Sequence, residues 1–122
     1  MTLLYLALLF GCLPEESAVQ ETPQAGDETV AAMRTNPLVY THHGTCRMAC
    51  RNIDEAEVAD ILHRSGTRDP ARTRTDGECP SHALEGHTGD GQHVRIVYAG
   101  CPDKTLVVTA IDLDTEWPCD CE

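Results

Sequence analysis

The chain has 122 residues, of which 20 are acidic and nine are basic, and its net charge at pH 7 is −11. Proteins that bind nucleic acids neutralise phosphates with Lys and Arg, so we expect no nucleic-acid partner. The length fits one small domain. One Phe, one Trp and three Tyr supply little large apolar surface, so the core is expected to need additional cross-links.

Residues 1–12 are apolar and end in Cys12. An apolar segment of this length is typical of a secretory signal. It is too short to cross a hydrocarbon core of about 30 Å as a helix. Residues 9–12 (Leu-Phe-Gly-Cys) resemble a bacterial lipobox. We therefore expect a lipoprotein-type signal sequence with lipidation at Cys12, and a domain attached to a membrane of the bacterial cell envelope that faces the periplasm or the cell exterior. The alternative is that Cys12 is only part of the apolar segment.

Residues 13–37 are rich in Pro, Gln, Glu and other polar residues. Few large apolar side chains are present to offset the entropy of ordering this stretch. The composition predicts an acidic, flexible tether between the signal sequence and a folded domain at residues 38–122.

Two helices are expected near the start of this domain, after a short extended entry at residues 38–40. The first covers residues 43–51. The second begins with a capping box, in which Asp54 is the N-cap and Glu57 is at position N3. Val58, Ile61 and Leu62 follow at helical spacing and predict a buried stripe, and Gly66 is expected to end this helix as a glycine cap.

The remainder is expected to form β-structure. Residues 67–80 contain two prolines and no periodicity, which predicts a loop. Residues 81–87, 92–99 and 105–113 are strand candidates, with a hairpin turn at residues 88–91. The predicted fold class is therefore α+β, with two short N-terminal helices packed on a three-stranded antiparallel meander and stabilised by disulfides.

Six cysteines within the expected domain predict disulfide bonds. If Gly89–Gly91 is a three-residue loop, Thr88 lies opposite Gln92, and the same register places Cys79 opposite Cys101. Directly opposed residues are within disulfide reach. We therefore expect a Cys79–Cys101 bridge at the base of the hairpin.

The other four cysteines form two close pairs, with Cys46 and Cys50 on one helical face and Cys119 and Cys121 beside Trp117. A bridge between residues i and i+2 is strained, so each tail cysteine is expected to reach the helix, with the pairing left open. Zinc held by these same four cysteines is the alternative, and free redox thiols are a third interpretation. Their spacings of three and one intervening residues fit disulfides better, and no cofactor is expected.

His43, Arg47 and Arg51 are spaced to lie along one side of the first expected helix. A histidine with two arginines suits phosphate contact or acid–base catalysis with a cationic stabiliser. Arginines on a helix more often pair with carboxylates and cover apolar surface. We treat these three residues as the alternative catalytic set.

Residues 43–58, with a His followed by Arg-Met, Arg-x-Ile and a Glu-Val helix, resemble the opening of the domain-of-unknown-function 4258 family. Residues 90–97 and 106–111 are similar to the two core strands of that family. The chain resembles an exported, cysteine-rich, lipoprotein-like branch that ends in Trp-Pro-Cys-Asp-Cys. The resemblance implies a fold similar to RelE-type and BrnT-type toxins, some of which cleave RNA, and candidate site residues at His43, Arg47 and Arg51.

Three functions remain open after these observations. The first is a lipid-anchored, disulfide-stabilised module of the cell envelope that binds a partner or has a structural role without catalysis. The alternatives are a ribonuclease of the RelE-like toxin type and a metal-binding protein. The acidic charge and the expected export favour the first.

Overall fold

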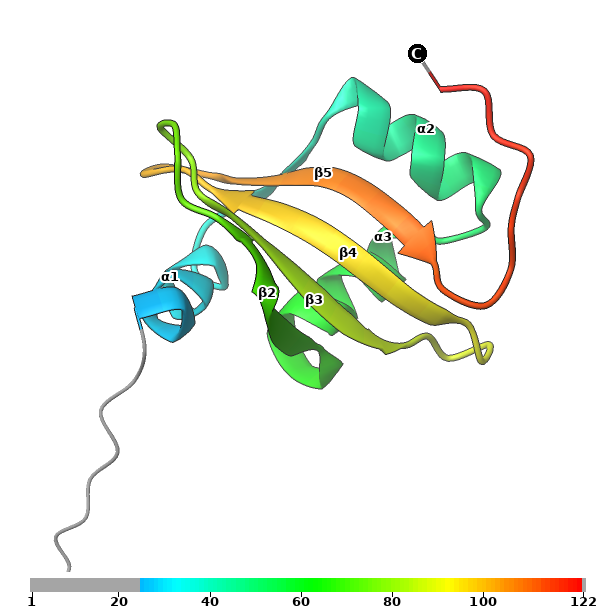
Figure 1. Ribbon diagram of the computed structural model, residues 1–122, viewed down its shortest axis with the longest axis horizontal. Coiled ribbons are helices and arrows are strands. Elements are labelled where there is room, and N and C mark those ends of the chain that lie inside the picture. The colour runs from blue at the N-terminus through cyan, green and yellow to red at the C-terminus, as the bar shows by residue number, and fades with distance from the viewer. Residues whose placement is uncertain (1–24, 122) are drawn as a thin grey trace, which may run out of the picture.

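The computed structural model describes residues 25–121, which form a five-stranded sheet with helices packed around it (Figure 1). The strands lie in the order β1-β5-β4-β3-β2, and every neighbouring pair is antiparallel except β1 and β5. The strands are β1 (Leu38–Tyr40), β2 (Thr67–Arg74), β3 (Ser81–His87), β4 (His93–Gly100) and β5 (Thr105–Asp112). The helices are α1 (Ala25–Met33), α2 (His42–Cys50), α3 (Glu55–Asp60) and a π-helical turn, η1 (Ile61–Ser65).

The expected three-stranded meander is therefore wrong, because the sheet has five strands and is mixed. Strands β3, β4 and β5 do follow one another as an antiparallel unit, but β1 and β2 extend it at its two edges. The segment expected as a loop contains β2, which accommodates Pro70 in an irregularity between Asp69 and Thr73. Edge strands tolerate proline because they pair on only one side. A proline within the segment makes such a strand harder to recognise from the sequence.

The β3–β4 hairpin has the expected register. Its strands pair from Ser81 opposite Ala99 to His87 opposite His93, and the Thr88 N–H donates to the Gln92 carbonyl over 2.9 Å. Gly91 has a φ of +93°, which favours glycine at this position of the turn.

Helix α3 begins with the expected capping box: Asp54 accepts from the Glu57 N–H, and the Glu57 carboxylate accepts from the Asp54 N–H. The helix then continues into η1. Gly66 does not have the left-handed conformation of a glycine cap, since its φ is −85°. Glycine is needed there because a Cβ would lie 2.4 Å from the Ile61 carbonyl oxygen.

Helix α1 lies within the stretch expected to be a tether, so the folded part begins earlier than residue 38. Val30 and Met33 are buried in the main core, and the buried Thr105 hydroxyl donates to the Met33 carbonyl over 2.9 Å. The expected signal sequence, Cys12 and residues 13–24 of the expected tether lie outside the described residues. No helix among residues 25–121 is long and apolar enough to cross a membrane.

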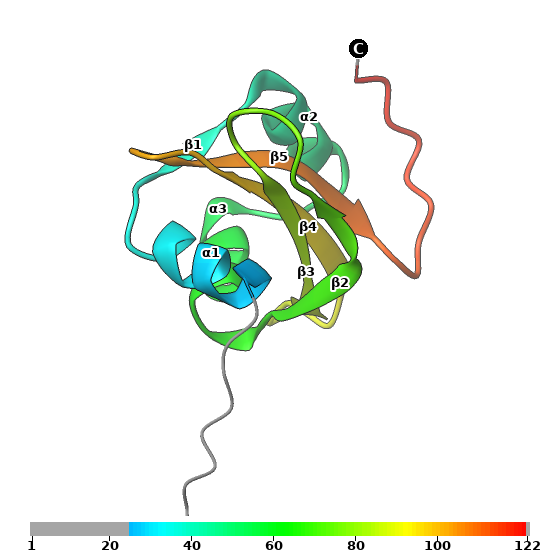
Figure 2. The ribbon, with the colours of Figure 1, turned by 60° about the vertical axis from the view of Figure 1, so that its left-hand side comes forward.

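The core lies between the curved sheet and the side of the molecule that carries helices α1 and α3 (Figure 2). Tyr98 is fully buried at its centre and donates its hydroxyl to the Val58 carbonyl over 2.6 Å. Burial raises the pKa of Tyr98 above its usual range, so this hydroxyl keeps its proton. The bond ties strand β4 to helix α3.

Candidate functional site

Helix α2, which carries the alternative catalytic set, lies against strand β5 (Figure 1). Thr41 is its N-cap: the hydroxyl accepts from the Gly44 N–H over 2.8 Å and donates to the Val107 carbonyl over 2.9 Å. A Cβ at Gly44 would lie 2.4 Å from that same carbonyl oxygen. Glycine therefore allows the helix to touch the backbone of β5.

Arg51, at the C-terminal end of α2, is engaged by the sheet. Its Nη1 donates to the Ala110 carbonyl on β5 over 2.6 Å. Only residues 105–107 of β5 pair with β1, so Ala110 lies beyond the part of β5 that β1 covers. Partial burial and the nearby Arg47 lower the pKa of Arg51, and Asp112 opposes this shift. An arginine keeps its charge in proteins, so Arg51 acts as a charged cap on an otherwise open strand edge.

His43 and Arg47 are in contact on the same helix. Arg47 Nε donates to His43 Nε2 over 3.3 Å, and both side chains are half-buried. The structure thus brings two of the three predicted residues together, while Arg51 is directed to β5. An imidazole that accepts from a guanidinium through Nε2 has that nitrogen occupied, and any acid–base role requires the contact to open.

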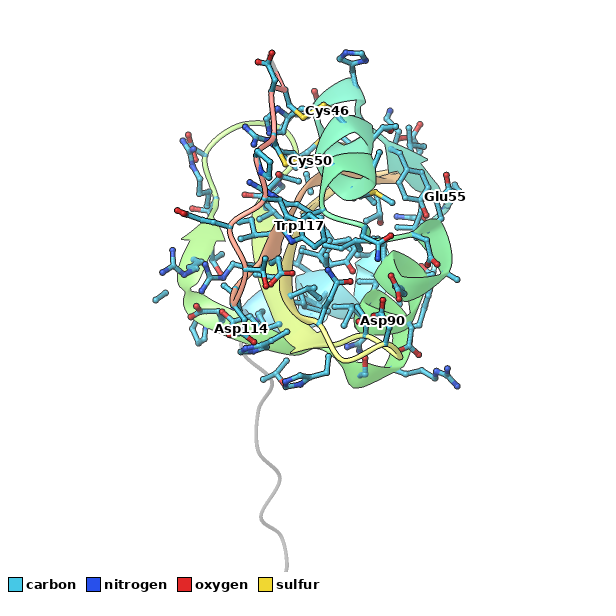
Figure 3. All side chains as sticks on the ribbon, turned by 90° about the vertical axis from the view of Figure 1, so that its right-hand side faces the viewer. Cys46, Cys50, Glu55, Asp90, Asp114 and Trp117 are labelled. Atoms are coloured by element: carbon cyan, nitrogen blue, oxygen red, sulfur yellow. A yellow bond between two sulfur atoms is a disulfide. The ribbon has the colours of Figure 1, made fainter. Side chains whose placement is uncertain are left out.

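The expectation of disulfide bonds is confirmed. Cys46 is joined to Cys121, Cys50 to Cys119, and Cys79 to Cys101, with Cα–Cα distances of 5.9, 5.7 and 4.5 Å. Two bridges therefore hold the C-terminal tail (residues 113–121) on α2. Figure 3 shows the tail rising from Asp114 past Trp117 to the cysteines of the helix.

These pairs leave no thiolate on Cys46, Cys50, Cys119 or Cys121 for the alternative zinc site. Within residues 25–121, no three His, Cys, Asp or Glu side chains are grouped so that they could hold a metal ion together. Three disulfides are typical of an oxidising extracellular or cell-envelope location.

Asp112 organises the start of the tail. Its Oδ1 accepts from the N–H groups of Asp114 and Thr115 over 2.9 and 3.0 Å. Its Oδ2 accepts from Trp117 Nε1 and Gln92 Nε2, each over 3.0 Å. The indole bond, with these further donors, lowers the pKa of Asp112 to about 2. The carboxylate therefore stays charged and fixes Trp117.

A shallow pocket of about 430 Å³ lies between β5 and the tail, and we refer to it as the tail pocket. Its lining combines one arginine, one indole and two carboxylates with smaller side chains: Arg51, Ile111, Asp112, Thr115, Glu116, Trp117 and Pro118. Arg51 thus contributes to a surface formed with the tail, whose lining includes neither His43 nor Arg47.

Replacing Asp112 by Asn is expected to flatten the dependence of stability on pH below about pH 4. The folded pKa lies below the ordinary value of 3.8, so the carboxylate stabilises the fold fully above that value and loses this effect as the pH falls towards 2. Urea unfolding at pH 2–5 measures the difference. Asp114→Asn is the matched control, since it removes a carboxylate from the same turn without removing the Asp112 contacts; an equal effect of both variants would contradict the assignment.

Sequence reasoning missed the Asp112 network. Its signal is local: an Asp at a strand end, followed two and three residues later by N–H groups that it can accept from, is a common turn pattern. The contribution of Gln92 could not be found this way, because Gln92 lies 20 residues before Asp112 in the sequence. Gln92 also donates to the Arg51 carbonyl over 2.9 Å, 41 residues away.

The fold and the three bridges define a small, disulfide-stabilised α+β domain. The chain belongs to the family described as Domain of unknown function (DUF4258), which matches residues 40–112 and so more than half of the chain. The resemblance inferred from the sequence motifs is confirmed in this respect. No curated protein and no solved structure matches the chain, so the likeness to RelE-type and BrnT-type toxins stays a prediction.

Proposed function

We propose that this protein is a lipid-anchored domain of the bacterial cell envelope that acts as a binding or structural module and does not catalyse a reaction. The observation that carries the proposal is that the residues of the predicted catalytic set make contacts within the domain. Arg51 caps the Ala110 carbonyl of β5, and His43 Nε2 is occupied by Arg47. All three candidate groups for chemistry therefore have contacts within the domain, and His43 and Arg51 would have to break theirs to take part in a reaction.

The tail pocket supports a binding role. It is formed by a segment that two disulfides and the Asp112–Trp117 bond hold in place, so little entropy is lost on ordering it when a partner binds. Its volume of about 430 Å³ lies within the usual range of ligand pockets, about 300–1,000 Å³. Trp117 and Arg51 are residue types that are enriched where partners bind.

Membrane attachment is expected to depend on Cys12. The Leu-Phe-Gly-Cys motif and the disulfides support export, and stable anchoring needs two or more acyl chains. Replacing Cys12 with Ser should move the protein from the membrane fraction to the soluble fraction, measured by fractionation of bacterial cells. Ser17→Ala is the control and should stay with the membranes. Retention of Cys12→Ser in the membrane fraction would rule out the lipid anchor.

The oxidised protein is expected to leave a mixed RNA substrate intact over hours. The net charge of −11 opposes binding of a polyanion, and His43 lacks a free Nε2. Gel analysis of RNA incubated with the wild type and with His43→Ala should show no difference. Robust cleavage that His43→Ala or Arg47→Ala abolishes would instead support the ribonuclease alternative.

A further inference from the structure

Two histidines face each other across the end of the β3–β4 hairpin. His87 lies directly opposite His93, and their rings are stacked, with centroids 4.5 Å apart and planes inclined by 10°. The neighbouring pair is joined by the bond from the Thr88 N–H to the Gln92 carbonyl. Hydrogen-bonded and non-hydrogen-bonded pairs alternate along an antiparallel ladder. The two histidines therefore form a non-hydrogen-bonded pair, the kind in which opposed side chains lie closer together.

The ring nitrogens of both histidines are available. In the part of the chain that the structure describes, neither imidazole has a hydrogen bond or an ion pair, and the two rings stack on each other. His87 is exposed and His93 is half-buried. Two other histidines differ, because His43 is occupied by Arg47 and His82 is fully buried.

Open space lies beside the pair. A pocket of about 450 Å³ is lined by Ser65, Thr67, Glu85, Gly86, His87 and His93. Its one carboxylate, Glu85, is bound to Arg95 at 2.8 Å. The two free groups with strong metal affinity in this pocket are therefore the imidazoles, with room next to them for an ion and its water ligands.

We propose that His87 and His93 form a binding site for a divalent first-row transition-metal ion, with Cu²⁺ bound most tightly. Imidazole suits these ions, and affinities at a given site rise towards Cu²⁺ and fall again at Zn²⁺. Two metal–nitrogen bonds of about 2.0–2.1 Å place the two nitrogens about 3–4 Å apart. Because an imidazole binds a metal in the plane of its ring, the stacked rings must turn out of the stack so that one nitrogen of each points at the same ion. Since no third protein ligand is grouped with them, water completes the coordination.

The site is distinct from the cysteine-based zinc site considered from the sequence. It needs no free thiol and is compatible with three intact disulfides, and the hairpin that carries it is paired from Ser81 opposite Ala99 to His87 opposite His93. The excess of negative charge raises the local concentration of cations around the whole molecule. The histidine pair then provides the specific contacts that distinguish a transition metal from Mg²⁺ or Ca²⁺.

The test titrates Cu²⁺, Ni²⁺ and Zn²⁺ separately into the untagged, oxidised full-length protein and follows the heat of binding. His87→Phe and His93→Phe keep an aromatic ring for stacking but remove the nitrogens, and His63→Phe, at another exposed histidine, is the matched control. We expect one Cu²⁺ site that is weakened at least tenfold in each of the first two variants and unchanged in the control. Ni²⁺ and Zn²⁺ should bind more weakly than Cu²⁺.

Electron paramagnetic resonance of the Cu²⁺ complex provides a second readout, since coupling to two nitrogens should fall to one in His87→Phe. That variant lies at an exposed position and is expected to fold, which its thermal unfolding checks. The proposal is overturned if Cu²⁺ does not saturate a site, if His87→Phe binds like the wild type, or if His63→Phe causes the same loss.

Discussion

Removing one of the two tail bridges is expected to lower the free energy of unfolding by about 2.5 kcal/mol, whereas removing both lowers it by about 7 kcal/mol. Cys46–Cys121 and Cys50–Cys119 span 75 and 69 residues and close almost the same loop. If either bridge remains, the unfolded chain keeps that long loop and gains only the freedom of a small ring. The loop-closure entropy of the long loop is therefore released only when both bridges are absent.

The measurement is urea unfolding of serine variants in a Cys12→Ser background, which prevents disulfide exchange with the seventh cysteine. The single-bridge variants are Cys50→Ser with Cys119→Ser and Cys46→Ser with Cys121→Ser. Emission of the only tryptophan reports directly on the tail: Trp117 should remain held by Asp112 in either single-bridge variant. In the variant that lacks both tail bridges, the emission of Trp117 should shift towards that of a solvated indole.

Loss of the Cys79–Cys101 bridge is the matched comparison. Its separation of 22 residues predicts a loss of about 3 kcal/mol, with no effect of the other bridges on this value, because this loop is at the base of the β3–β4 hairpin. A loss for both tail bridges that equals the sum of the two single losses would show that the two bridges do not share a loop in the way described.

Features set by neighbouring residues were predictable from the sequence. The capping box joins Asp54 to Glu57, and a three-residue turn fixes the β3–β4 register. From that register the opposition of Cys79 and Cys101 followed. In each case the interacting residues lie close in the sequence, or a local feature determines how distant residues align.

Features that depend on distant partners were not predictable. Strand β1 has only three residues and becomes a strand because β5 offers it a parallel edge. Strand β2 has Pro70 and several charged residues, and it is a strand because β3 pairs with it. Neither carries enough alternation of apolar and polar residues to predict a strand alone, so the mixed five-stranded sheet was missed.

The candidate site shows the same division. The proximity of His43 and Arg47 follows from their helical spacing, and the structure places them in contact. The role of Arg51 does not follow, because its acceptor, Ala110, is 59 residues away. The sequence therefore identified a set of polar side chains on α2 but not which of them the sheet engages.

Helix α1 provides the strongest test of where the domain begins. A chain that starts at Leu38, the boundary expected from composition, is predicted to lose about 3–6 kcal/mol of stability, since burial of one Val or Met side chain contributes about 1.5–3 kcal/mol. Val30 and Met33 are 4% and 1% exposed, so the truncation removes two core side chains. The Thr105 side chain also loses its acceptor at Met33 while remaining in the sheet.

A chain that starts at Ala25 is the matched control and is expected to unfold at the same urea concentration as the full-length protein, because it retains every described residue of α1. Hydrogen exchange at the Thr105 amide, which donates to the Pro37 carbonyl over 2.9 Å, should be fast in the Leu38 chain and slow in the Ala25 chain. Equal stability of the two chains would mean that α1 does not contribute to the core. A loss confined to the Leu38 chain would extend the folded unit beyond the residues that match the family, because α1 precedes residue 40.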